Sequence, residues 1–125
     1  MKKGKIISIN GNLFEYGGIE PCEYSKGYLH KVYEIDVDED GVLTATSRTD
    51  FYVDEDLKNN EVKFTKPQWY GVIELLVRQN YNLTDGEVEN LVKRVVEEGF
   101  ANGEPNTIEE AEKCISARVN KESEA

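Results

Sequence analysis

The hydrophobic pattern of the chain changes period near residue 65. Residues before this point show no helical periodicity, and several runs alternate apolar and polar side chains, as strands with one buried face do. Three later segments carry apolar residues at intervals of three and four, which is the spacing of one helix face. A parallel nucleotide-binding sheet would need strands and helices to alternate along the chain. The order therefore predicts an α+β fold, with an N-terminal antiparallel sheet of about four strands followed by a three-helix layer.

Each expected helix begins with the pattern Thr-x-x-Glu/Gln, in which two side chains satisfy free amides at the helix N-terminus. The pairs are Thr65 and Gln68, Thr84 and Glu87, and Thr107 and Glu110. The stripes expected to be buried are Trp69, Val72, Ile73, Leu76 and Val77; Val88, Leu91, Val92, Val95, Val96 and Phe100; and Ile108, Ala111, Ile115 and Val119. Gly99 and Gly103 are stop signals for the middle helix.

The expected strands are separated by turn signals. Asn10-Gly11, between two short apolar runs, is the strongest short signal for a hairpin. Residues 27–37 and 42–53 are expected to form two further strands around a second turn. Residues 17–27 are rich in glycine and contain a proline, so they are expected to form a connecting loop.

The length of 125 residues suits one domain with a modest core. We expect a single domain over residues 1–125, with a β-rich part in residues 1–62 and a helical part in residues 63–125. Two separate domains that divide near residues 56–64 are the alternative.

The composition is strongly acidic. The chain has 25 acidic and 15 basic side chains, which gives a formal net charge of -10. Direct binding to nucleic acid or to an anionic membrane is unfavourable, because both repel a negative surface. Basic proteins and cations are the partners that such a charge favours.

Residues 34–46, EIDVDEDGVLTAT, place a run of acids before a glycine. A calcium-binding EF-hand loop needs acids at positions one, three and five, glycine at six and a glutamate at twelve. The first four requirements are met, but Ser47 stands at position twelve and strands flank the segment. The pattern is therefore half of the motif in the wrong structural context, and no metal ligands are assigned.

A tight hairpin explains the same segment better. A three-residue loop over residues 39–41, with Gly41 in the left-handed conformation, pairs Asp38 with Val42. A two-residue loop would lose the apolar pairing that follows from this register. One face is then expected to carry Val37, Leu43, Ile35 and Ala45. The opposite, solvated face is expected to carry Glu34, Asp36 and Asp38.

Negative charge is concentrated around this hairpin. From residue 34 to residue 61 there are ten acids and two basic residues, so this stretch holds -8 of the net charge. We interpret the concentration as a surface for a basic partner, with nearby tyrosines as recognition residues. The predicted partner-binding residues are Glu34, Asp36, Asp38, Glu39, Asp40, Asp54, Glu55, Asp56, Tyr24 and Tyr28.

The sequence therefore favours a non-enzymatic, acidic protein-binding module. Its most concrete form is a phage- or mobile-element-type inhibitor that presents a negative face to a nucleic-acid-binding protein, such as a restriction or CRISPR nuclease. One strand face supplies a charge about every 6.7 Å, against one per about 1.7 Å in duplex DNA, so several acidic segments would have to converge. The alternatives are a small-ligand or divalent-metal-binding domain and an unrecognised small enzyme.

Catalytic and cofactor motifs are not apparent in the sequence. His30 is the only histidine, so neither a hydrolytic triad nor a zinc site with two imidazoles is expected within this chain, and His30 is expected to be a polar strand residue. There is no phosphate-binding loop and no dinucleotide-binding motif, so no catalytic residue and no cofactor is assigned. Cys22 and Cys114 have no metal-binding spacing. The first residues lack the apolar core of a signal peptide, so a cytoplasmic location is expected.

Overall fold

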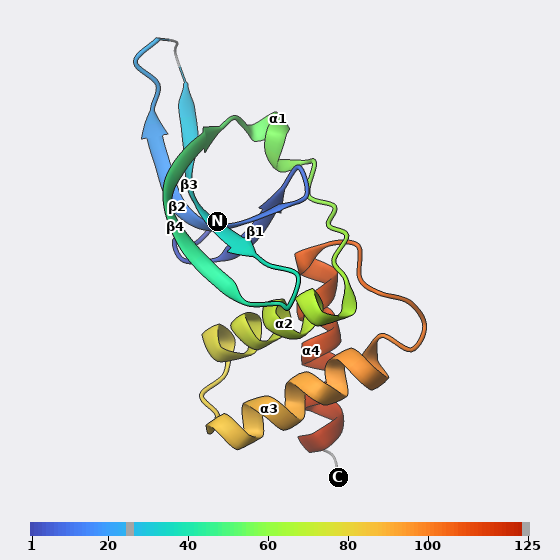
Figure 1. The fold of residues 1–125 in the computed structure, drawn as a ribbon. Helices are drawn as coiled ribbons and strands as arrows, with labels where there is room; N and C mark the ends of the chain where they lie inside the picture. The colour runs from blue at the N-terminus through green and yellow to red at the C-terminus, as the bar shows by residue number, and fades with distance from the viewer. Residues whose placement is uncertain (25–26, 124–125) are drawn as a thin grey trace. The chain divides into compact units, whose positions relative to one another are not determined.

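The computed structural model describes residues 1–24 and 27–123 (Figure 1). The chain forms two compact units, and each is described by itself. The sheet unit comprises Met1–Asp36 and Leu43–Lys63, and the helical unit comprises Val37–Val42 and Phe64–Ala125. The strands precede the long helices, so the predicted α+β fold is confirmed. That both units belong to one domain stays a prediction.

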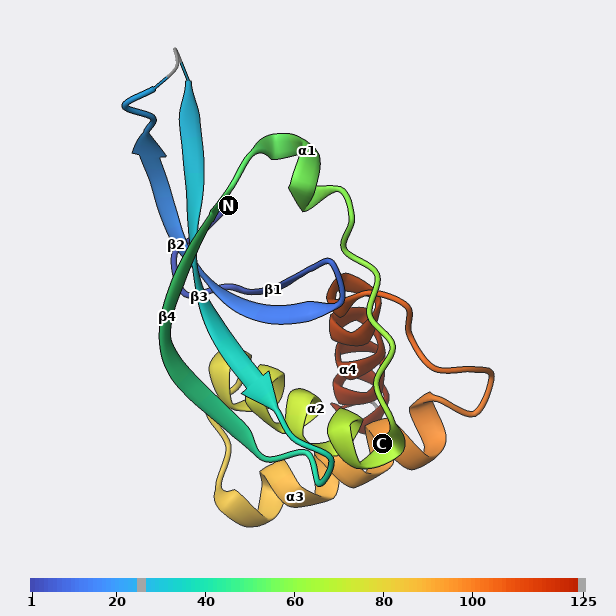
Figure 2. The ribbon, with the colours of Figure 1, turned by 45° about the horizontal axis from the view of Figure 1, so that its top comes forward.

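The sheet has four antiparallel strands in the order β1-β2-β3-β4, so neighbours in sequence are neighbours in space. Their bounds are Ile6–Ile9, Asn12–Pro21, Tyr28–Val37 and Leu43–Tyr52. Figure 2 shows the long strands β2, β3 and β4 curving along their length. The predicted first hairpin is confirmed, because Ile9 pairs with Asn12 across a two-residue turn. Asn10 and Gly11 have φ angles of 53° and 84°, the left-handed conformation that such a turn requires.

The expected loop over residues 17–27 is wrong in its first part, because β2 continues to Pro21. The two glycines form a bulge instead, where the register with β3 shifts between Tyr16 and Gly18. A Cβ atom on Gly17 would lie 2.7 Å from the ring of Tyr33 and 3.1 Å from the carbonyl oxygen of Lys31, so a larger residue would require the Tyr33 ring to move. The end of the expected loop includes Ser25 and Lys26, which lie outside the described residues.

Five buried side chains from β1, β2 and β3 form the core of the sheet unit. They are Ile7, Ile9, Phe14, Tyr16 and Val32. Tyr52 and Leu57 pack against this cluster, and the rings of Phe14 and Tyr52 meet edge to face at 5.8 Å.

A single helical turn, α1 at Asp54–Leu57, follows β4. Sequence periodicity did not predict it, because four residues are too short to show a helical period. The backbone N–H of Val53 donates to Asp56 Oδ2 at 3.1 Å, which caps the turn. The Ser8 hydroxyl donates to the carbonyl of Asn60 at 2.6 Å, so the chain after α1 is bound to β1.

The three long helices are α2 at Lys66–Asn80, α3 at Asp85–Arg94 and α4 at Ile108–Ser123. The predicted caps are confirmed, because Thr65 accepts from the N–H of Gln68 and Thr84 from that of Glu87. Thr107 likewise accepts from the N–H of Glu110 at 3.1 Å. The predicted stripes are buried as well, except that Val119 is only half-buried.

A π-helical turn, η1 at Val95–Gly99, continues α3. It keeps Val95 and Val96 buried and leads to Phe100, whose ring lies 5.5 Å from that of Trp69. The ring of Phe64 also meets that of Trp69 edge to face, with the ring centres 5.0 Å apart. Across the described ranges, none of the helices combines the length and the apolar character that crossing a bilayer requires.

Candidate cation-binding site

The acidic turn between β3 and β4 is the three-residue hairpin loop that the sequence predicted. The N–H of Asp38 donates to the carbonyl of Val42, and the N–H of Gly41 donates to the carbonyl of Asp38, both at 3.1 Å. The carboxylate Oδ1 of Asp38 accepts from the N–H groups of Asp40 and Val42, both at 2.9 Å. Asp38 therefore stabilises the turn, and its carboxylate is already engaged by the backbone.

Gly41 holds this turn against the start of α2. Its φ is 83°, and a Cβ atom there would lie only 2.1 Å from the carbonyl oxygen of Pro67. Only glycine tolerates both the left-handed conformation and this close backbone approach. The contact fixes where Asp40, the preceding residue, stands relative to α2.

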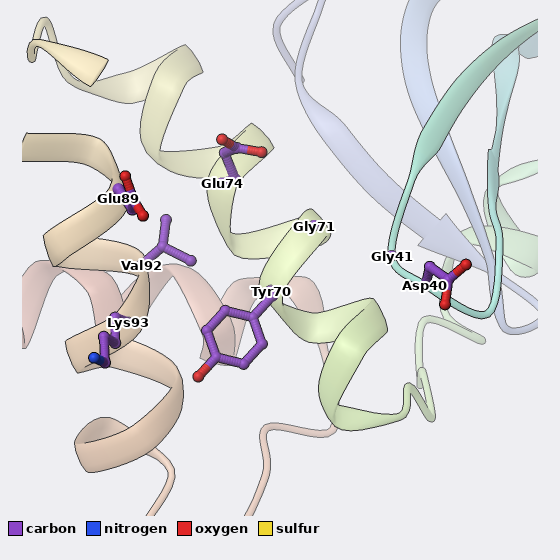
Figure 3. Close-up of a pocket in the computed structure, with 8 residues that line it drawn as sticks. All are labelled: Asp40, Gly41, Tyr70, Gly71, Glu74, Glu89, Val92 and Lys93. Carbon is purple, nitrogen blue, oxygen red and sulfur yellow. The ribbon is translucent and has the colours of Figure 1, made fainter. Parts of the chain in front are cut away.

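The turn, α2 and α3 line an open cavity of about 370 Å³, which we call the acidic cleft (Figure 3). Its lining is Asp40 and Gly41 from the turn, Tyr70, Gly71 and Glu74 from α2, and Glu89, Val92 and Lys93 from α3. This volume lies within the range of small-ligand sites. All of these residues belong to the helical unit.

The lining of the acidic cleft is negatively charged overall, with three carboxylates and one ammonium group. Glu74 is paired with Arg78, one turn later on α2, at 3.3 Å. In the described part of the chain, the carboxylates of Asp40 and Glu89 have no hydrogen-bond or ion-pair partner. Two of the three lining acids are thus unpaired, and the net negative charge of the lining favours a cationic ligand.

Tyr70 brings an aromatic ring into the same lining (Figure 3). Its hydroxyl donates to Glu97 Oε1 at 3.0 Å, which restrains the ring. Burial raises the pKa of Tyr70, and the hydrogen bond to Glu97 raises it further, so the phenol stays neutral at physiological pH. A neutral tyrosine beside carboxylates provides an electron-rich face for a cation.

The structure divides the predicted partner-binding residues between the two units. Asp38, Glu39 and Asp40 lie in the helical unit. The sheet unit holds Glu34, Asp36, Asp54, Glu55, Asp56, Tyr24 and Tyr28. That the two groups form one continuous acidic surface stays a prediction.

Several of the acids in the sheet unit already have partners. Arg48 pairs with Glu34 at 3.5 Å and with Asp50 at 3.3 Å. Asp56 caps α1 through the N–H of Val53. Among the described residues, the carboxylates of Asp36 and Glu55 have no such partner, and both residues are exposed. Tyr24 and Tyr28 are exposed as well.

The expectation that Glu34 projects from a solvated face is wrong. Glu34 lies opposite Phe14 in the β2–β3 register and two residues from Val32, so it shares the face that carries the core. Its side chain is only 28% exposed. The sheet buries both of its faces at β2, where consecutive residues Leu13 and Phe14 are both buried, so simple alternation did not identify the solvated side.

His30 takes part in a chain of hydrogen bonds that the sequence did not reveal. Its Nε2 lies 2.5 Å from Asp54 Oδ1, and its Nδ1 lies 2.7 Å from the hydroxyl of Tyr16. With a proton on Nε2, the Asp54 carboxylate accepts from Nε2–H; an unprotonated Nδ1 then accepts from the hydroxyl of Tyr16. Burial, and then the charge of Asp54, raises the pKa of Tyr16. Tyr16 is buried and the side chain of Asp54 is 93% exposed, so this arrangement connects the core of the sheet unit, through β2 and β3, to the surface at α1.

Neither cysteine forms a disulfide, and Cys114 is partly buried, which raises the pKa of its thiol. Within residues 1–24 and 27–123, no group of three or more His, Cys, Asp or Glu side chains is placed to hold a metal ion. No protein-family model, curated protein or solved structure matches this chain. The acidic cleft and the exposed carboxylates are therefore the features of this protein that bear on its function.

Proposed function

We propose that this protein is a non-enzymatic, cytoplasmic binding protein that captures a basic protein partner through uncompensated carboxylates. One observation carries the proposal: Asp40 and Glu89 line a cavity of about 370 Å³ without a hydrogen-bond or ion-pair partner among the described residues. Unpaired carboxylates raise the local concentration of a positively charged partner and increase its rate of association. The exposed acids Asp36, Glu39 and Glu55 add to the attraction.

The most concrete partner is a nucleic-acid-binding enzyme, such as a restriction or CRISPR nuclease that a phage or mobile element must inhibit. Such an enzyme has a groove lined with lysine and arginine, which binds phosphates largely through charge. An acidic protein with a net charge of -10 is suited to occupy that groove. This version of the proposal predicts that nucleic acid and the protein compete for the same partner.

The test is affinity capture with the full chain, followed by binding measurements on each purified captured protein. We expect the Asp40→Asn/Glu89→Gln variant to lose most of the affinity, and we expect binding to weaken steeply between low and moderate salt. The matched control is Glu61→Gln/Glu104→Gln, which removes the same charge from two exposed positions outside the cleft. Equal loss in both variants would show that net charge matters and the cleft does not.

Binding that is equally tight at all salt concentrations would contradict the attraction by charge. A partner whose binding is unaffected by excess duplex DNA would contradict the proposal that it is a nucleic-acid-binding enzyme.

A small organic cation is a second candidate ligand, because the volume of the cleft is that of a small-molecule site. Spermidine, which carries no guanidinium group, is a suitable probe for this alternative. Its binding would appear as a rise in melting temperature that the Asp40→Asn/Glu89→Gln variant does not show.

A further inference from the structure

We infer that the acidic cleft receives an arginine side chain of the partner and prefers it to lysine. The inference rests on the proposed function, since it specifies which group of a basic partner enters the site. It follows from three features of the lining: a glycine, Gly71, in the middle of α2, the restrained ring of Tyr70, and the carboxylates of Asp40 and Glu89, which have no hydrogen-bond or ion-pair partner among the described residues.

Gly71 lines the cleft from the middle of α2. Glycine inside a helix costs about 1 kcal/mol relative to alanine, so this position is poor for helix stability alone. It lies five residues into a helix of 15 residues, away from both caps, and it lines the cleft. Figure 3 shows Gly71 on α2, between the turn with Asp40 and the helix with Glu89.

Tyr70 supplies the surface on which a flat cation stacks. The hydroxyl bond to Glu97 holds the ring, so little side-chain freedom is lost when a ligand packs on it. A guanidinium group is planar and weakly hydrated, and it stacks on aromatic rings more readily than a compact, strongly hydrated ammonium group. The ring therefore discriminates between the two basic side chains, whereas carboxylates alone attract both.

Lys93 limits what the cleft accepts. Its ammonium group adds a positive charge to the lining, one helical turn after Glu89. The carboxylates of Asp40 and Glu89 attract a ligand with a single cationic group. The ammonium group of Lys93 would repel a second cation close to it. A single arginine side chain that enters the cleft thus fits this distribution of charge better than two cations held close together, as in a polyamine.

The experiment is an NMR titration of the full chain with three synthetic peptides, acetyl-Gly-Gly-X-Gly-Gly-amide, in which X is arginine, lysine or citrulline. We expect the arginine peptide to shift the amide signals of Gly41, Tyr70 and Gly71. We also expect it to bind about two- to fivefold more tightly than the lysine peptide, the ratio that a cation–π contact supplies. Citrulline has the same shape without the charge, so its peptide should not bind measurably.

Two variants of Tyr70 test the role of the ring. Tyr70→Leu should reduce the affinity for arginine to that for lysine, and Tyr70→Phe, which keeps the ring and removes only the hydroxyl, should retain the preference. Melting temperatures establish that both variants are folded. The peptide comparison on the unchanged protein decides the matter even where a variant fails to fold.

Lysine binding as tightly as arginine, a preference that survives Tyr70→Leu, or spermidine binding more tightly than the arginine peptide each overturns the inference. These outcomes leave the proposed function standing, provided that Asp40→Asn/Glu89→Gln still loses the protein partner. Absence of peptide binding, together with full partner capture by that double variant, would overturn both.

Discussion

Gly41 shows how one residue connects the acidic turn to a helix. Its left-handed φ of 83° is what a three-residue hairpin loop demands of its last residue. The same residue also lies against the carbonyl of Pro67, where no side chain fits. The first property follows from local turn chemistry, and the second follows from packing within the helical unit. Because the turn conformation and the contact with Pro67 both require glycine at position 41, they also determine where Asp40 lies in the acidic cleft.

We therefore expect Gly41→Ala to lower the free energy of unfolding by about 2 kcal/mol or more, because the methyl group adds a clash to the cost of a left-handed residue. The matched control is Gly11→Ala, since Gly11 has a φ of 84° and no atom within 4 Å of its missing Cβ. Urea denaturation measures both. Equal losses in the two variants would mean that the contact with Pro67 contributes nothing.

Tyr16 offers a second prediction for a single side chain. Its buried hydroxyl bonds to Nδ1 of His30, so Tyr16→Phe leaves a ring nitrogen without its partner. We expect the free energy of unfolding to fall by about 1–2 kcal/mol. Tyr28→Phe is the control, because Tyr28 is 70% exposed and should lose its hydroxyl at no measurable cost. If urea denaturation showed the same free energy of unfolding for Tyr16→Phe and the wild-type protein, the structural role of these hydrogen bonds would be contradicted.

At the scale of elements, the start of α3 depends on a titrating side chain. Glu87 accepts from both the N–H and the hydroxyl of Thr84, at 3.1 Å and 2.9 Å. These bonds favour the ionised carboxylate and lower the pKa of Glu87 from its ordinary value. A carboxyl with a lowered pKa in the folded state stabilises the protein above its ordinary pKa. That stabilisation is lost as pH falls through the lower, folded value.

Glu87→Gln isolates this effect, because glutamine keeps a capping oxygen but does not titrate. We expect the wild-type protein to be more stable than the variant at neutral pH and the difference to shrink as pH falls. Urea midpoints of both proteins between about pH 7 and pH 2 measure this difference in stability. The contributions of all other carboxylates cancel, because both proteins contain them. A difference that is constant across this range would show that the charge of Glu87 does not contribute.

At the scale of the whole molecule, acidic residues have two distinct uses. Asp38 and Asp56 cap backbone segments, and Asp54 bonds to His30, so replacing them would change folding as well as binding. The exposed carboxylates of Asp36, Glu39 and Glu55 have no partner in the described part of the chain. Like Asp40 and Glu89, this second group tests the attraction of a basic partner without removing a hydrogen bond that holds the fold.

We therefore expect the free energy of unfolding of the variant Asp36→Asn/Glu39→Gln/Glu55→Gln to lie within about 0.5 kcal/mol of the wild-type value. We expect it to bind its basic partner more weakly at low salt, mainly through a slower association rate, and to show a shallower dependence on salt. Stopped-flow or surface-binding kinetics at several salt concentrations measure this. An unchanged association rate would remove these residues from the proposed interface.

Local patterns predicted much of the fold. Hydrogen bonds within a few residues determine where the helices start, at Thr65, Thr84 and Thr107. Backbone angles determine the turns in the same local way, at Gly11 and Gly41. The buried stripes follow from helical periodicity, which needs no knowledge of what packs on them. Local composition also led to the wrong prediction of a loop at Gly17 and Gly18. A glycine pair has the same composition whether it lies in a loop or, as here, at a bulge within a strand.

By itself, the sequence determined the α+β order of elements, the caps, the hairpin turns and the excess of negative charge. Only the tertiary structure decided that Asp40 shares a cleft with Tyr70 and Glu89, that Asp54 bonds to His30, and that Glu34 is half-buried. The physical reason is distance along the chain. Caps and turns join residues up to four positions apart, whereas His30 and Asp54 are 24 positions apart and meet only when the sheet and α1 have packed.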